Sequence, residues 1–454
     1  MAQAQTVNVS RLVDEQKIGG FHIMLIVWSF LVLLSDGYDI GAIAYAAPSL
    51  AKAWHITSRA AFGPVFSSLF IGMLIGAPLL GYLGDRFGRK KAIIAGAIWY
   101  GLCVLGQTQA TSLDQLLWLR LLSGIGIGGI LPNTIALNAE FAPARFRATM
   151  VIIMFTGITF GGGVPGPIAA WLVPQYGWQV LFYIGGIVPI VVGLCLLFAL
   201  PESLKFLVVR KTRQAEAVRI ARMLAPQANI GPETQFVADA AEGRGSANPA
   251  ELFKHGLAVV TPLLWILFMI NLMVFYFMNS WIPLIFTDAG LPLTATALAV
   301  TIFQWGGTLG GYVIARPVDK WHFAPIVAYF AIGTIVVASV GYLEHNQTAL
   351  LIAVGLSGFC TLGLQFAINA MSGLIYPTQF RSMGIGWAFG AGRIGSFLGP
   401  MIGAALIAAH IPFQQLFIYA AAPLILGLIV SLMIIPAYNK ARSAESMEPS
   451  LQAS

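Results

Sequence analysis

Residues 81–91 read GYLGDRFGRKK and form a charged loop in an otherwise apolar part of the chain. It joins two apolar runs, Ala60–Leu83 and Ala92–Gln109. Each run is close to the ~20 residues that a helix needs to cross the hydrocarbon core of a bilayer. A short, mostly basic loop between two such runs predicts a pair of transmembrane helices whose connection faces the cytoplasm.

Apolar runs of this length recur along the whole chain of 454 residues. Hydrophobic residues make up 58% of the chain and charged residues 9%, and the mean hydropathy of +0.80 excludes a soluble protein. We predict an all-α membrane protein in which about twelve transmembrane helices form two six-helix bundles. The predicted spans are Phe21–Ala47, Ala60–Leu83, Ala92–Gln109, Leu113–Asn138, Thr149–Val173, Trp178–Leu200, Leu257–Ile282, Thr294–Ala315, Ala324–Leu343, Ala349–Leu374, Gly384–Ala409 and Phe413–Ala437.

A polar stretch between the sixth and seventh runs divides the chain. It is rich in Lys and Arg, and it predicts a short amphipathic helix followed by a tether that contains Gly, Pro and Asn. The predicted domains are an N-terminal bundle at residues 1–200, a cytoplasmic linker at 201–256, a C-terminal bundle at 257–437 and a cytoplasmic tail at 438–454.

The distribution of basic residues predicts the orientation. Of the 25 Lys and Arg residues, Lys52 and Arg59 fall in loops on one side of the membrane, and Arg120 and Arg393 fall inside predicted spans. All the others lie on the opposite side, which the positive-inside rule identifies as cytoplasmic. We therefore expect both termini in the cytoplasm and interpret the pI of about 9.3 as contact with anionic lipid, without a nucleic-acid partner.

An internal repeat with an offset of 234 residues relates the two bundles. This offset superposes Asp85 on Asp319 and Gly72 on Gly306. Parallel repeats of this kind build a large group of secondary transporters, in which the substrate site lies between the halves. When the sequence is shifted by the same 234 residues, each charged residue inside a predicted span is aligned with an uncharged residue of the other half. Side chains that break a symmetric scaffold at an energetic cost are candidates for function.

Two carboxylates, Asp36 and Asp39, lie three residues apart in the otherwise apolar first span. This spacing predicts that they share one helix face. Each charge is costly in hydrocarbon and the two repel each other, so we expect at least one of them to hold a proton near neutral pH. Both are candidates for proton coupling. The alternative is that one of them pairs with a neighbouring Arg or caps a broken helix.

Several motifs are similar to those of the major facilitator superfamily. The loop at residues 81–91 resembles the signature between its second and third helices, the fourth span opens with Arg120-x-x-x-Gly124-x-Gly126, and the sixth ends in Pro201-Glu202-Ser203. Asp36-Gly37-Tyr38-Asp39 resembles the acidic tetrapeptide of the aromatic acid:proton symporter family within that superfamily. The resemblance covers nearly the whole chain.

This resemblance implies a monomeric importer that alternates between outward and inward access in a bacterial inner membrane. Its substrate would be an aromatic or similar small organic carboxylate. The proton would be the coupling ion, and we expect no other cofactor. The family pattern assigns transport roles to Asp36, Asp39, Asp85, Arg86, Arg89, Arg120 and Glu140.

Arg393 is the candidate that binds the substrate carboxylate, because a planar guanidinium pairs with a carboxylate through two parallel hydrogen bonds. Arg120 is equally compatible with substrate contact and with pairing to the Asp group. Amide and ring side chains within the helices are candidates for contact with the rest of the substrate. These are Tyr38, Asn271, Tyr276, Asn279, Gln304, Trp305, Gln365 and Asn369. Each alone is also compatible with a packing contact between helices.

Charges at the cytoplasmic helix ends predict a gate that ties the helices together in one conformation. The candidates are Asp85, Arg86, Arg89, Glu140, Arg147, Asp319 and Arg381. The alternative for the basic members is that they only set the topology.

Enzyme signatures are missing from the sequence, since the six His are dispersed and no metal-ligand spacing occurs. We therefore expect no catalytic residue and no metal. Two other functions are alternatives to import. The elements Gly161–Pro167 and Gly395–Gly403 resemble a Gly-Pro motif of drug antiporters and suggest a proton-driven drug or metabolite exporter. A membrane sensor without transport would need a signalling domain beyond the short tail after Ala437.

Overall fold

The computed structural model describes residues 6–210, 213–228, 230–237, 249–254, 256–376 and 380–451. In this part of the chain, ten helical segments are long and apolar enough to cross a bilayer. Two shorter helices, α4 (Arg89–Gln107) and α13 (Ala324–Val340), lie among them and complete the twelve. The predicted all-α membrane fold is therefore confirmed.

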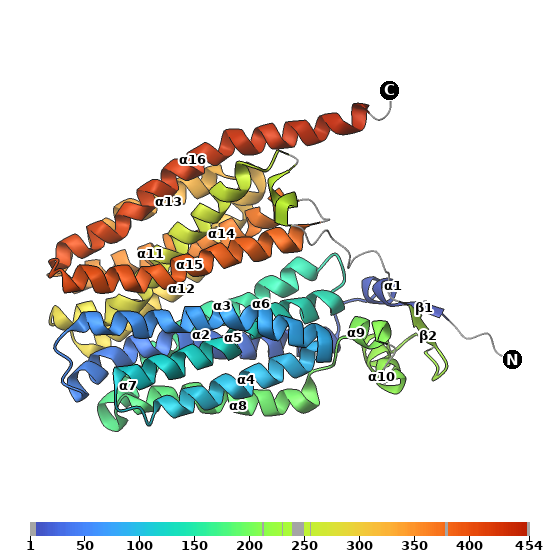
Figure 1. Ribbon diagram of the computed structural model, residues 1–454, viewed down its shortest axis with the longest axis horizontal. Helices are drawn as coiled ribbons and strands as arrows, with labels where there is room; N and C mark the ends of the chain where they lie inside the picture. Colours follow the sequence, from blue (N-terminus) through green and yellow to red (C-terminus); the bar gives the residue numbers. More distant parts are fainter. Residues whose placement is uncertain are drawn as a thin grey trace.

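The helices run roughly along the long axis of the molecule and form two halves, one above the other in the view of Figure 1. Besides α4, the first half contains α2 (Gly20–Ala53), α3 (Phe62–Phe87), α5 (Leu113–Phe141), α6 (Arg147–Gly163), α7 (Pro165–Tyr176) and α8 (Gln179–Ala199). Besides α13, the second half contains α11 (Val260–Asp288), α12 (Leu293–Trp321), α14 (Gln347–Ile375), α15 (Arg381–Ala408) and α16 (Phe413–Leu451).

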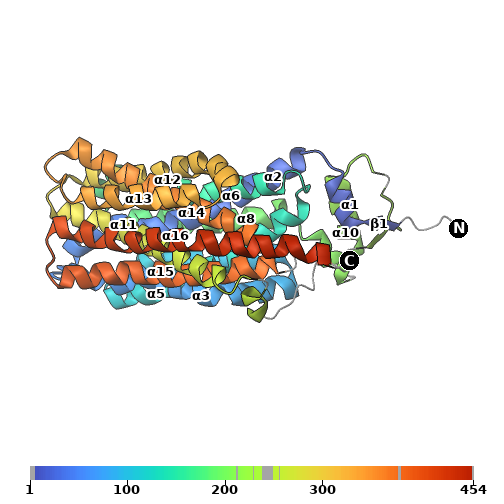
Figure 2. The ribbon, with the colours of Figure 1, turned by 90° about the horizontal axis from the view of Figure 1, so that it is seen from above.

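Short elements gather at the end of the bundle that carries both termini (Figures 1 and 2). They are α1 (Val9–Asp14), α9 (Leu204–Val209), α10 (Gln214–Leu224) and the strands β1 (Thr6–Asn8) and β2 (Gln235–Val237). The two strands pair in parallel with Thr6 opposite Gln235, which joins the N-terminal segment to the linker. Two short 3₁₀ helices, η1 (Arg59–Ala61) and η2 (Pro249–Phe253), precede α3 and α11.

The predicted span Thr149–Val173 corresponds to one membrane-length segment, Thr149–Tyr176, in which the helical hydrogen bonding is interrupted at Val164. Helix α6 ends at Gly163 and α7 begins at Pro165. Proline has no backbone N–H to continue the helical ladder, and the preceding glycines are poor helix formers. A side chain at Gly162 would overlap the Gln304 amide of α12. The glycines therefore allow this segment to approach the other half closely.

The internal repeat is confirmed in the packing of the glycines. A Cβ atom at Gly72 would overlap the Leu121 carbonyl of α5, and one at Gly306 would overlap the Gly355 carbonyl of α14. Both members of the first pair are 234 residues from their counterparts in the second. The same small-residue contact thus holds α3 to α5 and α12 to α14.

Several contacts between the two halves lie toward the end opposite the termini. Ser67 Oγ of α3 donates to the Phe397 carbonyl of α15 at 2.8 Å. The rings of Phe66 and Trp281 meet edge to face with centroids 5.2 Å apart. Toward the end that carries the termini, the ribbons of the halves diverge (Figure 1). The structure thus has one closed end, which the predicted orientation places outside the cell.

Candidate functional site

A cavity of about 140 Å³ lies between the two halves, near the middle of the helices that line it. Its walls come from α2, α3, α5 and α6 of the first half and from α11, α12, α14 and α15 of the second. Most of the side chains that line it are aliphatic or aromatic. The polar side chains of the wall are Asp36, Thr159, Tyr276, Gln304, Gln365, Asn369, Arg393 and Ser396. An apolar pocket with a few placed polar groups is typical of a small-molecule site.

Asp36 and Arg393 bring opposite charges to this cavity. Asp36 is buried on α2, and its Oδ1 atom has no hydrogen-bond partner among the described residues. Arg393 of α15 donates from Nη1 to Sδ of Met73 at 2.8 Å. A thioether is only a weak acceptor. The guanidinium therefore keeps hydrogen-bonding capacity for an anion that enters the cavity.

Asp39 and Arg120 form a buried ion pair within the first half. Asp39 Oδ2 lies 4.0 Å from Arg120 Nη1, and the side chains are 0% and 1% exposed. Neither residue is part of the cavity wall. Three residues of α-helix leave Asp36 and Asp39 about 60° apart around the axis. This angle takes Asp36 to the cavity and Asp39 toward α5, so the two carboxylates share a face only loosely.

Removal of one partner from the Asp39–Arg120 pair is expected to destabilise the protein. Arg120→Gln leaves the Asp39 carboxylate buried and unpaired, which costs about 3–5 kcal/mol when a buried pair is broken. Thermal unfolding in detergent is the measurement, and the single variant is expected to melt several degrees lower. The double variant Asp39→Asn/Arg120→Gln removes both charges and is expected to regain part of the loss. A double variant no more stable than Arg120→Gln would contradict the pairing.

The predicted amides form two hydrogen-bonded groups on the second half. Gln304 Nε2 donates to Asn279 Oδ1 at 2.8 Å. Asn271 Nδ2 donates to Gln365 Oε1, and Gln365 Nε2 donates to Asn369 Oδ1, each at 2.9 Å. Gln304, Gln365 and Asn369 line the cavity, whereas the two remaining amides are buried behind them.

Two predicted contact residues lie away from the cavity. Trp305 is 41% exposed and stacks on Phe160, with ring centroids 5.6 Å apart. The hydroxyl of Tyr38 donates to the Leu181 carbonyl of α8 at 3.1 Å. Trp305 is turned by about 100° around α12 from Gln304, because one residue of α-helix advances by that angle. In this conformation the structure therefore brings Gln304, but not its neighbour, to the cavity.

The predicted gate contains an ion-pair cluster within the first half. Arg89 Nη2 lies 3.0 Å from Glu140 Oε1, and Ser203 Oγ donates to the same Glu140 carboxylate. Glu202 Oε1 accepts from the backbone N–H groups of Lys90 and Ser203 at 3.1 and 3.0 Å. The cluster joins the start of α4, the end of α5 and the start of α9. Glu202 and Ser203 are members that the predicted gate did not contain, although their Pro201-Glu202-Ser203 motif was visible in the sequence.

Gly88 makes this cluster possible. Its φ of 110° lies in the region that favours glycine, and a Cβ atom there would overlap the Glu202 carboxylate. Among the described side chains, Arg86 of the predicted gate contacts a different residue. Arg86 Nη1 donates to the Tyr82 hydroxyl at 2.9 Å, and the side chain of Arg381 lies outside the described residues. The exposed charges at this end include Asp85, Arg86, Arg147 and Asp319.

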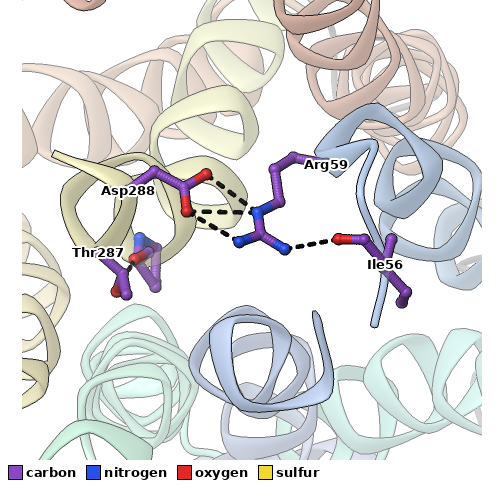
Figure 3. A network of polar contacts seen from close by, with 5 residues as sticks. Ile56, Arg59, Thr287 and Asp288 are labelled. Atoms are coloured by element: carbon purple, nitrogen blue, oxygen red, sulfur yellow. Dashed lines mark hydrogen bonds and ion pairs between the residues drawn. The ribbon is translucent and has the colours of Figure 1, made fainter. Parts of the chain in front are cut away.

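An ion pair at the opposite end joins the two halves (Figure 3). Arg59 Nε and Nη2 donate to the Asp288 carboxylate at distances from 3.1 to 3.3 Å. Arg59 Nη1 also donates to the Ile56 carbonyl at 2.8 Å, which fixes the guanidinium. Sequence reasoning used Arg59 only for topology and did not single out Asp288. The available signal was two opposite charges predicted at the same membrane face.

Comparison with known proteins identifies the family. A family model described as Major Facilitator Superfamily matches residues 29–343 and 264–453. The chain belongs to the Major Facilitator Superfamily. A bacterial homologue of the human lysosomal transporter Spinster, solved in an inward-facing and unoccupied conformation, has the same fold. The TM-score is 0.67 at 16% identity, over 94% of this chain and 98% of that one.

Curated relatives narrow the family to transporters of aromatic acids, as the sequence resemblance predicted. The chain is 35% identical to a gallate transporter of Pseudomonas putida over 92% of both chains. It is 34% identical to a 4-hydroxybenzoate transporter of Pseudomonas aeruginosa, over 92% of this chain and 94% of that one. The protein is therefore a multi-pass membrane transporter, and the prediction that it is not an enzyme is confirmed.

Proposed function

We propose that the protein imports a small aromatic carboxylate together with protons across a bacterial inner membrane by alternating access. The observation that carries the proposal is the cavity between the halves, in which Arg393 and Asp36 are the two charged side chains of a mostly apolar wall. Arg393 would pair with the substrate carboxylate. Asp36 would take up a proton from outside and release it inside. The relatives named above for gallate and 4-hydroxybenzoate support the substrate class.

Proton coupling supplies the energy that import of an anion requires. Moving one negative charge inward against an inside-negative potential costs about 2.3 kcal/mol per 100 mV. One proton per carboxylate cancels this charge, so the pH gradient alone drives accumulation. A second proton would add the voltage as a driving force, and Asp39 is the candidate to hold it. Fluxes measured at a series of imposed voltages test the stoichiometry, because a one-proton cycle with a monoanion is independent of voltage.

The direction of transport is tested in proteoliposomes under an imposed pH gradient. Labelled gallate, 4-hydroxybenzoate and benzoate are offered outside, with protein-free liposomes as the control. Accumulation driven by outside acid supports import, and uphill efflux supports the proton-driven exporter. Lack of movement of all three acids in either direction rejects the proposed import. The Gly-Pro element of α15 is weak support for the exporter, because close packing of helices already accounts for its glycines. A Cβ atom at Gly395 or Gly399 would overlap the Met269 or Met273 carbonyl of α11.

Loss of the Arg59–Asp288 pair is expected to weaken closure of the outer end. The two side chains are 30% and 41% exposed, and such a pair contributes roughly 0–1 kcal/mol. Asp288→Asn is thus expected to raise the outward-open population by up to about fivefold. Distances between spin labels on Gln109 and His345, in outer loops of the two halves, report this population.

Two further variants separate this effect from a general loss of charge. The double variant Arg59→Asp/Asp288→Arg keeps the pair with reversed charges and is expected to restore the wild-type distance distribution. Glu15→Gln removes the exposed Arg11–Glu15 pair within the N-terminal segment and is expected to change nothing. Equal distributions in the wild type and Asp288→Asn would show that the pair does not hold the outer end closed.

A further inference from the structure

The hydrogen bonds of Asn271, Gln365 and Asn369 have a fixed direction. Asn271 Nδ2 donates both to the Thr361 backbone carbonyl at 3.0 Å and to Gln365 Oε1 at 2.9 Å. A backbone carbonyl only accepts, so the nitrogen of Asn271 must face it. The second Nδ2 hydrogen then points at Gln365, which must accept this hydrogen bond with its Oε1 atom. One obligate acceptor on α14 thereby sets the orientation of the first two amides.

The same logic extends to the edge of the cavity. With its oxygen turned to Asn271, Gln365 presents Nε2 to Asn369 and donates to its Oδ1 atom at 2.9 Å. Asn369 therefore turns its oxygen toward Gln365 and keeps its Nδ2 group, a donor without acceptor capacity, for other contacts. Asn271 is fully buried, whereas Asn369 is partly exposed and lines the cavity. The chain of amides thus ends at the cavity in a donor.

The surroundings make this donor selective. The wall contributed by the first half carries acceptors at Asp36 and Thr159, but most of it consists of apolar side chains that offer no acceptor, among them Ile40, Ile127, Leu131 and Phe155. When a ligand fills an apolar cavity, a donor that faces a C–H group is left unpaired, and that is costly. A site built to hydrogen-bond a substrate hydroxyl strongly rejects the analogue that lacks it.

We propose that the chain Asn271–Gln365–Asn369 is the element that selects ring-hydroxylated aromatic acids over unsubstituted ones. The inference rests on the proposed function, in which Arg393 holds the carboxylate. Asn369 Nδ2 donates to the hydroxyl oxygen of the ring, and Asn271 is a positioning residue that acts through Gln365. An aromatic amine has a nitrogen that accepts poorly, so an aminobenzoate gains little from this donor although it has nearly the size of a hydroxybenzoate.

The test is competition in proteoliposomes that carry the full-length protein. Uptake of labelled 4-hydroxybenzoate is inhibited by unlabelled benzoate, 3- and 4-hydroxybenzoate, and 4-aminobenzoate. In the wild type, the better hydroxybenzoate is expected to compete about tenfold more strongly than benzoate or the amine, as one unpaired buried donor implies. Asn369→Leu is expected to reduce this ratio to below about threefold, mainly by loss of affinity for the hydroxylated acid.

Additional variants separate selectivity from folding. Asn369→Asp has the same shape and still accepts from Gln365, but it replaces the donor by an acceptor, so the hydroxyl-to-amine ratio is expected to fall to about one. Asn271→Leu lies outside the cavity and is expected to lower the same ratio, which a merely structural role would not move. Asn133→Leu is the control, because Asn133 is also a buried amide but bonds the Leu80 and Gly129 carbonyls; its ratio is expected to stay at the wild-type value.

The outcomes distinguish this inference from the proposed function. If the wild type takes up the hydroxylated acid and Asn369→Leu and Asn369→Asp keep the wild-type ratios, the inference is rejected and the proposed function stands. If the wild type transports none of the aromatic acids, both are rejected. A ratio that falls in the Asn369 variants and in Asn271→Leu, but not in Asn133→Leu, supports the chain as the selective element.

Discussion

Asp36→Asn is expected to abolish accumulation driven by the pH gradient while leaving exchange of substrate across the membrane. Asparagine has the shape of aspartate but cannot carry a proton. One proton per substrate and a gradient of one pH unit support about tenfold accumulation, because one pH unit corresponds to about 1.4 kcal/mol. The variant is expected to reach only equal concentrations on both sides. The measurement is uptake of 4-hydroxybenzoate into proteoliposomes with and without outside acid.

Counterflow separates a coupling defect from a dead protein. Vesicles preloaded with unlabelled substrate exchange it for labelled substrate without net proton movement, so Asp36→Asn is expected to retain this exchange within a few-fold of the wild type. Asp114→Asn is the matched control, since Asp114 is an exposed acid in the first turn of α5 and is expected to leave accumulation intact. Tenfold accumulation by Asp36→Asn at equal protein levels would remove this carboxylate from the coupling mechanism.

Arg393→Gln is expected to lower the affinity for aromatic carboxylates on the order of 100-fold or more. The guanidinium offers two charge-assisted hydrogen bonds to a carboxylate, each worth about 1.5–3 kcal/mol, and glutamine replaces them by one neutral donor. Arg393→Lys keeps the charge but loses the planar pair of donors, so an intermediate loss of about tenfold is expected. Equilibrium binding of labelled 4-hydroxybenzoate to purified protein is the measurement.

The control for this variant is another arginine removed from a different environment. Arg86 is exposed and donates to the Tyr82 hydroxyl, so Arg86→Gln is expected to bind with wild-type affinity. Near-wild-type affinity in Arg393→Gln would show that the carboxylate binds elsewhere. Arg120 would then be the next candidate, although its present partner is Asp39.

The spans could be predicted from the sequence because membrane insertion is governed by local composition. The local interruption between Gly163 and Pro165 covers one residue and leaves this predicted span as one membrane-length segment. The pairing of β1 with β2 was not predictable, since each strand has three residues and the two lie far apart in the chain. Such short strands carry no periodic signal of their own.

The candidate site could be predicted only in its residue types. Asp36 and Arg393 stood out because charges are costly in hydrocarbon, and both line the cavity. Trp305 stood out for its ring, but it faces Phe160 instead. In a helix that is apolar on most sides, the pattern of side chains does not define which face meets the other half. The rotation of such a helix about its own axis is set by the helices that pack against it.

The class of fold, the repeat of two halves and the few charges that the membrane must accommodate could thus be predicted before the structure. These follow from composition and spacing along one helix. The structure was needed to show that Asp36 faces the cavity while Asp39 pairs with Arg120, and that Arg59 joins Asp288 across 229 positions of the chain. The reason is physical: such contacts depend on how helices rotate and pack against each other, and packing is a property of the assembled bundle.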